Sequence, residues 1–117
     1  MIAVIFEAEP QAGEAEIYFD IAAALRGQLQ SIDGFVSIER FESTSHRGRY
    51  LSLSFWRDEA AIAQWRNTTE HRTAQERGRR SIFKDYRLRI AHVVRDYGMH
   101  ERTEAPSDSK AAHGFAT

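Results

Sequence analysis

Four segments of the chain alternate between apolar and polar side chains, which is the period of a β-strand with one buried face. These segments are residues 2–9, 35–42, 49–56 and 84–97. In the last of them, Tyr86, Leu88 and Ile90 fall on one face, and Arg87 and Arg89 fall on the other. The pattern therefore predicts four strands, of which the last is the longest.

Two further segments carry apolar side chains at intervals of three and four residues, the period of an amphipathic helix. The first covers residues 14–32 and ends at Gly34, a residue type that terminates helices. The second starts at Asp58, a residue type that caps helix N-termini. A new capping sequence at residues 67–70 predicts that this helix breaks and restarts as a short basic helix.

The resulting order of elements is β-α-β-β-α-β, the ferredoxin-like plan of an α+β fold. We expect residues 1–97 to form one such domain, and the polar residues 98–117 to form a flexible tail. Both faces of the sheet carry apolar side chains, but the two helices can cover only one face. Because a large uncovered apolar face marks an interface, the pattern predicts a homodimer joined through the open sheet faces.

Composition places the chain among ordinary globular domains. Its 117 residues are 42% hydrophobic and 28% charged, which suits a single modest core. The chain has no cysteine, so thiolate nucleophiles and cysteine-ligated metal sites are excluded. It has no run of about 18 apolar residues and no basic start typical of a secretory signal. We therefore expect a cytoplasmic protein with no membrane partner.

Charge is unevenly distributed, although the net value is only −1. Residues 66–89 hold eight Lys and Arg against three acids, whereas residues 1–65 hold five Arg against ten acids. The basic block is either a solvated helix face or a binding patch. A near-neutral chain is a poor candidate for nucleic-acid binding, because phosphate neutralisation dominates that affinity. Residues 47–55 match the signature strand of RNA-recognition domains only in part, so no nucleic-acid partner is expected.

An ordered set of short sequence features runs through the first 97 residues. It consists of Gly34-Phe35, Glu39-Arg40-Phe41, the segment 50–60, Trp65-Arg66, Glu70-His71-Arg72, Gln75, Phe83, Tyr86 and the segment 93–97. This set resembles the antibiotic biosynthesis monooxygenase family. The resemblance implies a dimeric α/β barrel with a hydrophobic pocket between sheet and helices in each subunit. Its members include cofactor-free oxygenases of polyaromatic quinols and haem-degrading monooxygenases, and the family supports a fold more strongly than a reaction.

Trp65 and His71 are the first two candidate catalytic residues. The resemblance implies that Trp65 lines the pocket and stacks on a flat aromatic substrate; the alternative is a core anchor on the helix stripe. His71 is the favoured base for a phenolic proton, since the pKa range of histidine suits chemistry at neutral pH. It is alternatively an axial haem ligand, or a helix-cap histidine paired with a carboxylate.

Tyr86 and Arg95 complete the candidate set. Either side chain is able to orient or stabilise a phenol or quinone oxygen, and Arg95 is alternatively a member of an interface ion pair. His92, on the apolar face of the last strand, is expected to be an interior or interface residue rather than a ligand.

The expected function is oxidation of a small aromatic ligand by O₂ without a tightly bound cofactor. Haem binding and degradation is an alternative, but two positions depart from the haem-degrading relatives that the resemblance brings in. Gln75 stands where these relatives place a ligand histidine, and Glu7 stands near their first-strand asparagine. No paired histidines at metal-ligand spacing are present, so no metal is expected. A non-catalytic small-molecule-binding or stress-response dimer is the remaining alternative.

Overall fold

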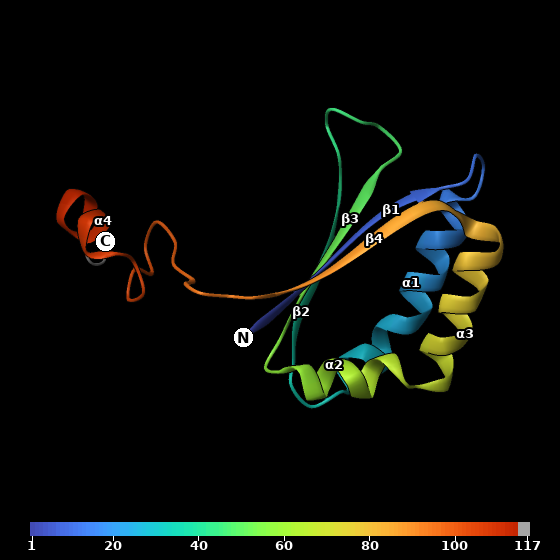
Figure 1. Ribbon diagram of the computed structural model, residues 1–117, viewed down its shortest axis with the longest axis horizontal. Helices are drawn as coiled ribbons and strands as arrows, with labels where there is room; N and C mark the ends of the chain where they lie inside the picture. Colours follow the sequence, from blue (N-terminus) through green and yellow to red (C-terminus); the bar gives the residue numbers. More distant parts are fainter. Residues whose placement is uncertain (115–117) are drawn as a thin grey trace.

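A computed structural model describes residues 1–114 and confirms the predicted order of strands and helices (Figure 1). Four strands form the sheet: β1 (Ile2–Pro10), β2 (Phe35–Glu42), β3 (Tyr50–Trp56) and β4 (Phe83–His92). The helices are α1 (Ala15–Gln30), α2 (Glu59–Arg66), α3 (Thr69–Arg77) and α4 (Ser107–His113), and a π-helical turn, η1 (Gly78–Ile82), joins α3 to β4. The predicted α+β ferredoxin-like fold is therefore correct.

The sheet is antiparallel, with strand order β2-β3-β1-β4. Its register places Ile2 opposite Trp56 on one side and His92 on the other, and Phe6 opposite Ser52 and Leu88. Residues directly opposite each other point to the same face, so the register tells which side chains share a surface. We call the face that carries Ile2 and Phe6 the helical side, because the core against the helices forms there.

The last strand is shorter than the alternation predicts. β4 ends at His92, and the amide of Val93 makes one more bond, to the carbonyl of Met1. Residues 94–97 keep an alternating sequence but lie outside the strand, so alternation alone overestimates its length.

The core lies between the helical side of the sheet and helices α1 and α2. Its buried members come from β1, from α1 and the turn after it, from β3 and from α2. They are Ile2, Leu29, Ile32, Trp56, Ala61, Ile62 and Trp65. Trp56 is almost fully buried, and its indole N–H donates to Ser54 Oγ at 2.9 Å. This bond satisfies the one polar group that burial of the ring would otherwise leave unpaired. The stripe of apolar residues predicted for the first helix is thus the surface that faces the sheet.

Both predicted capping residues are found at helix starts. The amide of Ala61 donates to Asp58 Oδ1 at 2.9 Å, and the amide of His71 donates to Thr68 Oγ1 at 3.3 Å. Each bond satisfies one of the amides that the first turn of a helix leaves free. The chain therefore breaks between α2 and α3 where the sequence predicts.

The opposite face of the sheet is not covered by any helix of residues 1–114 (Figure 1). We call it the open face. Its apolar side chains come from three strands: Ile5, Phe41, Leu51, Leu53 and Phe55. An ion pair between Arg89 Nη1 and Glu7 Oε1, 3.1 Å apart, lies among them.

Residues 93–114 leave the sheet as an arm and end in α4, well away from the helices (Figure 1). The arm folds around Arg102, whose buried guanidinium donates to the carbonyl oxygens of Gly98, Ser109 and Gly114 and lies over the ring of Tyr97. The sequence pattern did not predict α4. The last three residues of the expected tail, 115–117, lie outside the described residues.

No helix within residues 1–114 is long and apolar enough to cross a membrane.

Candidate functional site

Trp65 and His71 lie in contact on the helical side. Their ring centroids are 4.8 Å apart and the rings are nearly perpendicular, at 81°. Trp65 ends the apolar stripe of α2, and His71 lies in the first turn of α3. The cap residue Thr68 holds the two together, because its hydroxyl donates to the Trp65 carbonyl at 2.9 Å and accepts from the His71 amide. The break between two helices thus brings two aromatic side chains, six residues apart, into an edge-to-face pair.

The imidazole of His71 has a buried nitrogen, Nδ1, without a hydrogen-bond partner among the described residues 1–114. Burial above all, together with the neighbouring cations Arg72 and Arg66, lowers the pKa of His71 from its ordinary value of 6.5 to about 4. His71 is therefore neutral at pH 7. The alternative of a helix-cap histidine paired with a carboxylate is wrong for the described part of the chain.

Two exposed apolar side chains lie on the helical side of the edge strand β4. Leu88 and Ile90 lie opposite Phe6 and Val4 in register, so they share the face that the helices cover. They are nevertheless 51% and 42% exposed, because β4 is an edge strand that α1 and α2 do not reach. Exposed large apolar residues grouped in this way mark a ligand or partner surface. We call Leu88 and Ile90 the apolar strip.

Tyr86 begins the same face of β4, at the end of the sheet remote from Trp65. Its register partner on β1 is Ala8, whereas the core around Trp65 forms at Ile2. The Tyr86 ring packs against Phe6 and Phe83, with centroids 5.6 and 5.9 Å away. Its hydroxyl accepts a hydrogen bond of 2.5 Å from Arg79 Nη1. Tyr86 therefore lies on the helical side, at one end of the apolar strip and at the end of the sheet remote from Trp65.

Arg95 is not brought to this surface within one chain. It lies beyond the end of β4, in the arm, and is exposed. The structure thus places Trp65 and His71 together, Tyr86 on the same face, and Arg95 apart from all three.

A model of one protein family matches residues 1–77, more than half of the chain. The chain belongs to the antibiotic biosynthesis monooxygenase family. A curated relative from Pyricularia oryzae, jasmonate monooxygenase ABM, is 48% identical over 94 residues, which are 80% of this chain and 44% of that protein. An uncharacterised relative from Bacillus subtilis, YqjZ, is 36% identical over 70 residues, which are 60% of each chain. The chain therefore spans less than two thirds of the length of either relative.

Solved structures agree with the family at the level of the fold. Rv0793 from Mycobacterium tuberculosis superimposes with a TM-score of 0.74 over 83% of this chain and 98% of that one, at 14% identity. PA3566 from Pseudomonas aeruginosa gives a TM-score of 0.68 over 80% and 93% of the two chains, at 17% identity. At such low identity the likeness concerns the fold alone.

The antibiotic biosynthesis monooxygenase family raises the question of haem, and the residues present do not fit it. Glu7, which replaces the asparagine expected of haem-degrading relatives, lies on the open face, where it pairs with Arg89. His71 lies on the helical side. Glu7 and His71 therefore cannot line one haem pocket within a chain, and no step of the reaction is derived through haem.

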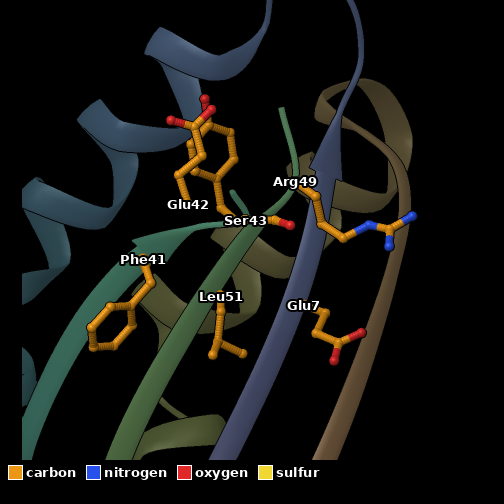
Figure 2. A pocket seen from close by; sticks show the side chains of 7 residues that line it. Glu7, Phe41, Glu42, Ser43, Arg49 and Leu51 are labelled. Atoms are coloured by element: carbon orange, nitrogen blue, oxygen red, sulfur yellow. The ribbon is translucent and has the colours of Figure 1, made fainter. Parts of the chain in front are cut away.

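A hollow of about 340 Å³ lies at the end of the β2–β3 hairpin (Figure 2). Glu7, Phe41 and Leu51 project from the open face into it, and Arg49 stands at its rim. A second hollow, of about 290 Å³, lies beside Phe19 and Arg40. Neither is lined by any of the four predicted site residues. Within residues 1–114, no group of three or more His, Asp or Glu lies close enough together to hold a metal ion.

Sequence reasoning missed one residue of this surface, Arg79. Its only signal is membership of the basic block 66–89, which has eight cations and no pattern that distinguishes one of them. The structure distinguishes Arg79 by its contact with Tyr86, seven residues along the chain.

Proposed function

We propose that this chain is a monooxygenase that oxidises a small aromatic molecule of the quinol or polyketide type with O₂, without a tightly bound cofactor. Membership of the antibiotic biosynthesis monooxygenase family supports the reaction class. The observation that carries the proposal is the buried, unpartnered His71 nitrogen against Trp65, on the side of the sheet that also carries the exposed apolar strip. A flat apolar ligand there would stack on aromatic and aliphatic side chains and meet one hydrogen-bond acceptor.

The proposed reaction needs only the substrate and O₂. Loss of a phenolic proton gives an anion that transfers one electron to O₂, and recombination of the two radicals forms a carbon hydroperoxide. Loss of water from the hydroperoxide leaves a carbonyl group. In total a CH₂ carbon, or its phenolic tautomer, becomes a C=O group. Two hydrogens of the substrate and one oxygen atom of O₂ leave as water. The substrate supplies all four electrons that reduce O₂.

His71 would act as the base in the first step. A neutral imidazole with a pKa of about 4 is ready to accept a hydrogen bond at pH 7, but alone it would hold the proton weakly. The phenolate formed beside it changes this, since an opposite charge within about 4–6 Å raises the pKa of an imidazolium. Trp65 would orient the ring, and the surrounding apolar side chains would exclude water and strengthen the ion pair.

The jasmonate relative favours a second candidate substrate class, a hydrophobic carboxylic acid. Hydroxylation of a C–H bond in such an acid consumes two electrons and two protons besides O₂. A reduced flavin or nicotinamide would have to supply them. Assays with an acid substrate therefore include such a donor, whereas assays with quinols do not.

The open face supports the proposal of a homodimer. Its apolar side chains, among them Leu53 and Phe55, have no covering helix within residues 1–114. Two such faces packed on each other would remove them from water, which stabilises association by about 25 cal/mol for each Å² buried. The dimer would also place the arm of each chain next to its partner and give Arg95 the interface role that the sequence left open.

Oxygen uptake with a panel of anthrones and naphthohydroquinones tests the activity. We expect protein-dependent uptake that falls at least 100-fold in His71→Gln and less in Trp65→Phe, which keeps an aromatic ring. Arg77→Met, which changes one exposed cation outside this surface, is the control and retains activity. Uptake no faster than autoxidation across the panel would leave a non-catalytic binding or stress-response dimer as the better account.

A haemin titration tests the haem alternative. We expect no saturable shift of the Soret band at one haem per subunit. A saturable shift, followed by loss of the band with ascorbate in air, would overturn the assignment of the reaction to a cofactor-free site.

A further inference from the structure

Arg79 and Tyr86 together present hydrogen-bond donors. Arg79 Nη1 donates to the Tyr86 hydroxyl at 2.5 Å, and its guanidinium lies 6.0 Å from the centre of the Tyr86 ring. A phenol that accepts such a bond still has its own proton to donate, and a guanidinium has five N–H groups. The pair therefore offers a positive charge, N–H donors and one O–H donor to whatever lies beside it.

No carboxylate of residues 1–114 is paired with Arg79. Two other cations of the same block do have such partners: Arg80 pairs with Glu76, and Lys84 pairs with Glu9. Asp85 precedes Tyr86 in the chain, but in register it faces Glu9, on the side of the sheet opposite to Tyr86. Its carboxylate accepts from the Tyr86 amide rather than from Arg79.

The chain holds Arg79 in place through an unusual local structure. Arg79 lies in the π-helical turn η1, and π-helical turns are frequently found at functional sites. The preceding residue, Gly78, is buried, and a Cβ there would lie 2.8 Å from the ring of Phe83. Because Phe83 in turn packs on Tyr86, this close approach fixes the turn directly above the phenol.

The apolar strip runs along β4 from this pair. Tyr86, Leu88 and Ile90 follow one another on one face of the strand, and Tyr86 and Ile90 are about 13 Å apart at the usual rise of a strand. Leu88 and Ile90 are exposed, so the strip has hydrogen-bond donors at one end and an uncovered apolar surface along its length.

We propose that Arg79 and Tyr86 bind the carboxylate of a hydrophobic acid whose apolar part lies over Leu88 and Ile90. This inference rests on the proposed function and narrows its substrate class to carboxylates. A carboxylate accepts from a guanidinium and from a hydroxyl at the same time, and such charge-assisted bonds are roughly twice as strong as neutral ones. An ester of the same acid keeps the apolar contacts but loses the charge. The site would thus select the acid.

Binding without turnover tests the inference. Jasmonic acid is the probe and its methyl ester is the neutral counterpart, titrated calorimetrically at one ionic strength with no reductant present. The variants are Arg79→Met, which removes the charge, and Tyr86→Phe, which keeps the ring packing. Arg77→Met removes a cation two residues away that contacts no carboxylate in residues 1–114 and is the matched control for long-range charge effects.

We expect the wild-type protein to bind the acid about tenfold more tightly than the ester. Arg79→Met should weaken the acid about tenfold and leave the ester within twofold, and Tyr86→Phe should weaken the acid by a few fold. Equal affinity for acid and ester, or an equal loss in Arg77→Met and Arg79→Met, would overturn the inference. Selective binding of the acid without any oxygen uptake would contradict the proposed function alone, whereas turnover of a carboxylate-bearing quinol that Arg79→Met does not affect would contradict only the carboxylate anchor.

Discussion

His71 holds the one buried side-chain nitrogen or oxygen within residues 1–114 that lacks a hydrogen-bond partner. Such an atom costs free energy in folding, because burial removes water and no protein group replaces it. A ligand hydroxyl at that position would repair the loss. The same burial keeps the ring neutral, and Trp65 fixes its orientation. One side chain thus links the energetics of the fold to the proposed chemistry.

The depressed pKa of His71 predicts a pH dependence of stability. The unfolded chain binds a proton below pH 6.5, whereas the folded chain does so only near pH 4. The contribution is therefore complete above pH 6.5 and declines as the pH falls from 6.5 toward 4. We expect wild type to lose about 2 kcal/mol more than His71→Gln over this range, a value reduced because the ring is only partly buried. Urea unfolding at pH 7.5 and pH 4.5 measures it; equal losses in both proteins would contradict it.

The residue scale also shows what the sequence can and cannot predict. Trp65 and His71 are recognisable candidates from their types and spacing, and the structure brings them together. Arg79 is not recognisable, because its partner Tyr86 depends on how η1 turns onto β4. The exposure of Leu88 and Ile90 is equally hidden, since alternation assigns them to the covered face.

At the scale of elements, the break between α2 and α3 and the π-turn between α3 and β4 determine where the site residues stand. The first is readable in the sequence as a capping signal at Thr68. The π-turn is not readable in the sequence. It depends on the contact between Gly78 and Phe83, and no periodic pattern of residues marks that contact. The end of β4 is not readable in the sequence either, because the strand stops at His92 although the alternation runs to Tyr97.

Removing the cap of α3 should loosen His71. In Thr68→Ala the amide of His71 and the carbonyl of Trp65 both lose a partner, so we expect a loss of about 1 kcal/mol in unfolding free energy. Hydrogen exchange of the His71 amide should become faster than in wild type. Thr69→Ala, one residue along and exposed, is the control and should change neither quantity. Unchanged exchange at His71 in Thr68→Ala would show that the cap does not hold the pair.

Two glycines in helical segments should respond in opposite directions to alanine. In Gly78→Ala the new Cβ would lie 2.8 Å from the Phe83 ring, which Phe6, Tyr18 and Tyr86 hold in place, so we expect a loss of about 1–3 kcal/mol. In Gly27→Ala, in the exposed part of α1, nothing lies within 4 Å and we expect a gain of up to about 1 kcal/mol. Chemical denaturation measures both. A gain in Gly78→Ala would show that the turn is not held by this contact.

At the scale of the whole molecule, the sheet separates two surfaces that carry different side chains. The helical side carries Trp65, His71 and the apolar strip, and the open face carries a broad apolar surface with the Glu7–Arg89 ion pair. The arm extends beyond both (Figure 1). The element order fixes this division, so the sequence predicts that the helices cover one face of the sheet and leave the other uncovered. How the arm folds around Arg102 could not be predicted, because its bonds are to backbone carbonyls and leave no pattern in the sequence.

A charge on the open face should separate the subunits of the proposed dimer. Leu53 lies in the middle of that face, opposite Ile5. Sedimentation velocity should find wild type as a dimer and Leu53→Arg as a folded monomer, because burying an unpaired guanidinium costs several kcal/mol. Ala23→Arg, on the exposed surface of α1, is the control and should remain dimeric. A monomeric wild type at tens of micromolar would contradict the proposed interface.

We propose above that the helical side is a cofactor-free oxygenation site with His71 as its base. Turnover of an anthrone under ¹⁸O₂, in buffer with a chelator, tests it most directly through the mass of the product and the O₂ consumed. We expect one ¹⁸O atom in each quinone and one O₂ consumed for each product. The turnover rate should fall at least 100-fold in His71→Gln and stay unchanged in Arg77→Met. Product without ¹⁸O, or equal rates in wild type and His71→Gln, would contradict it.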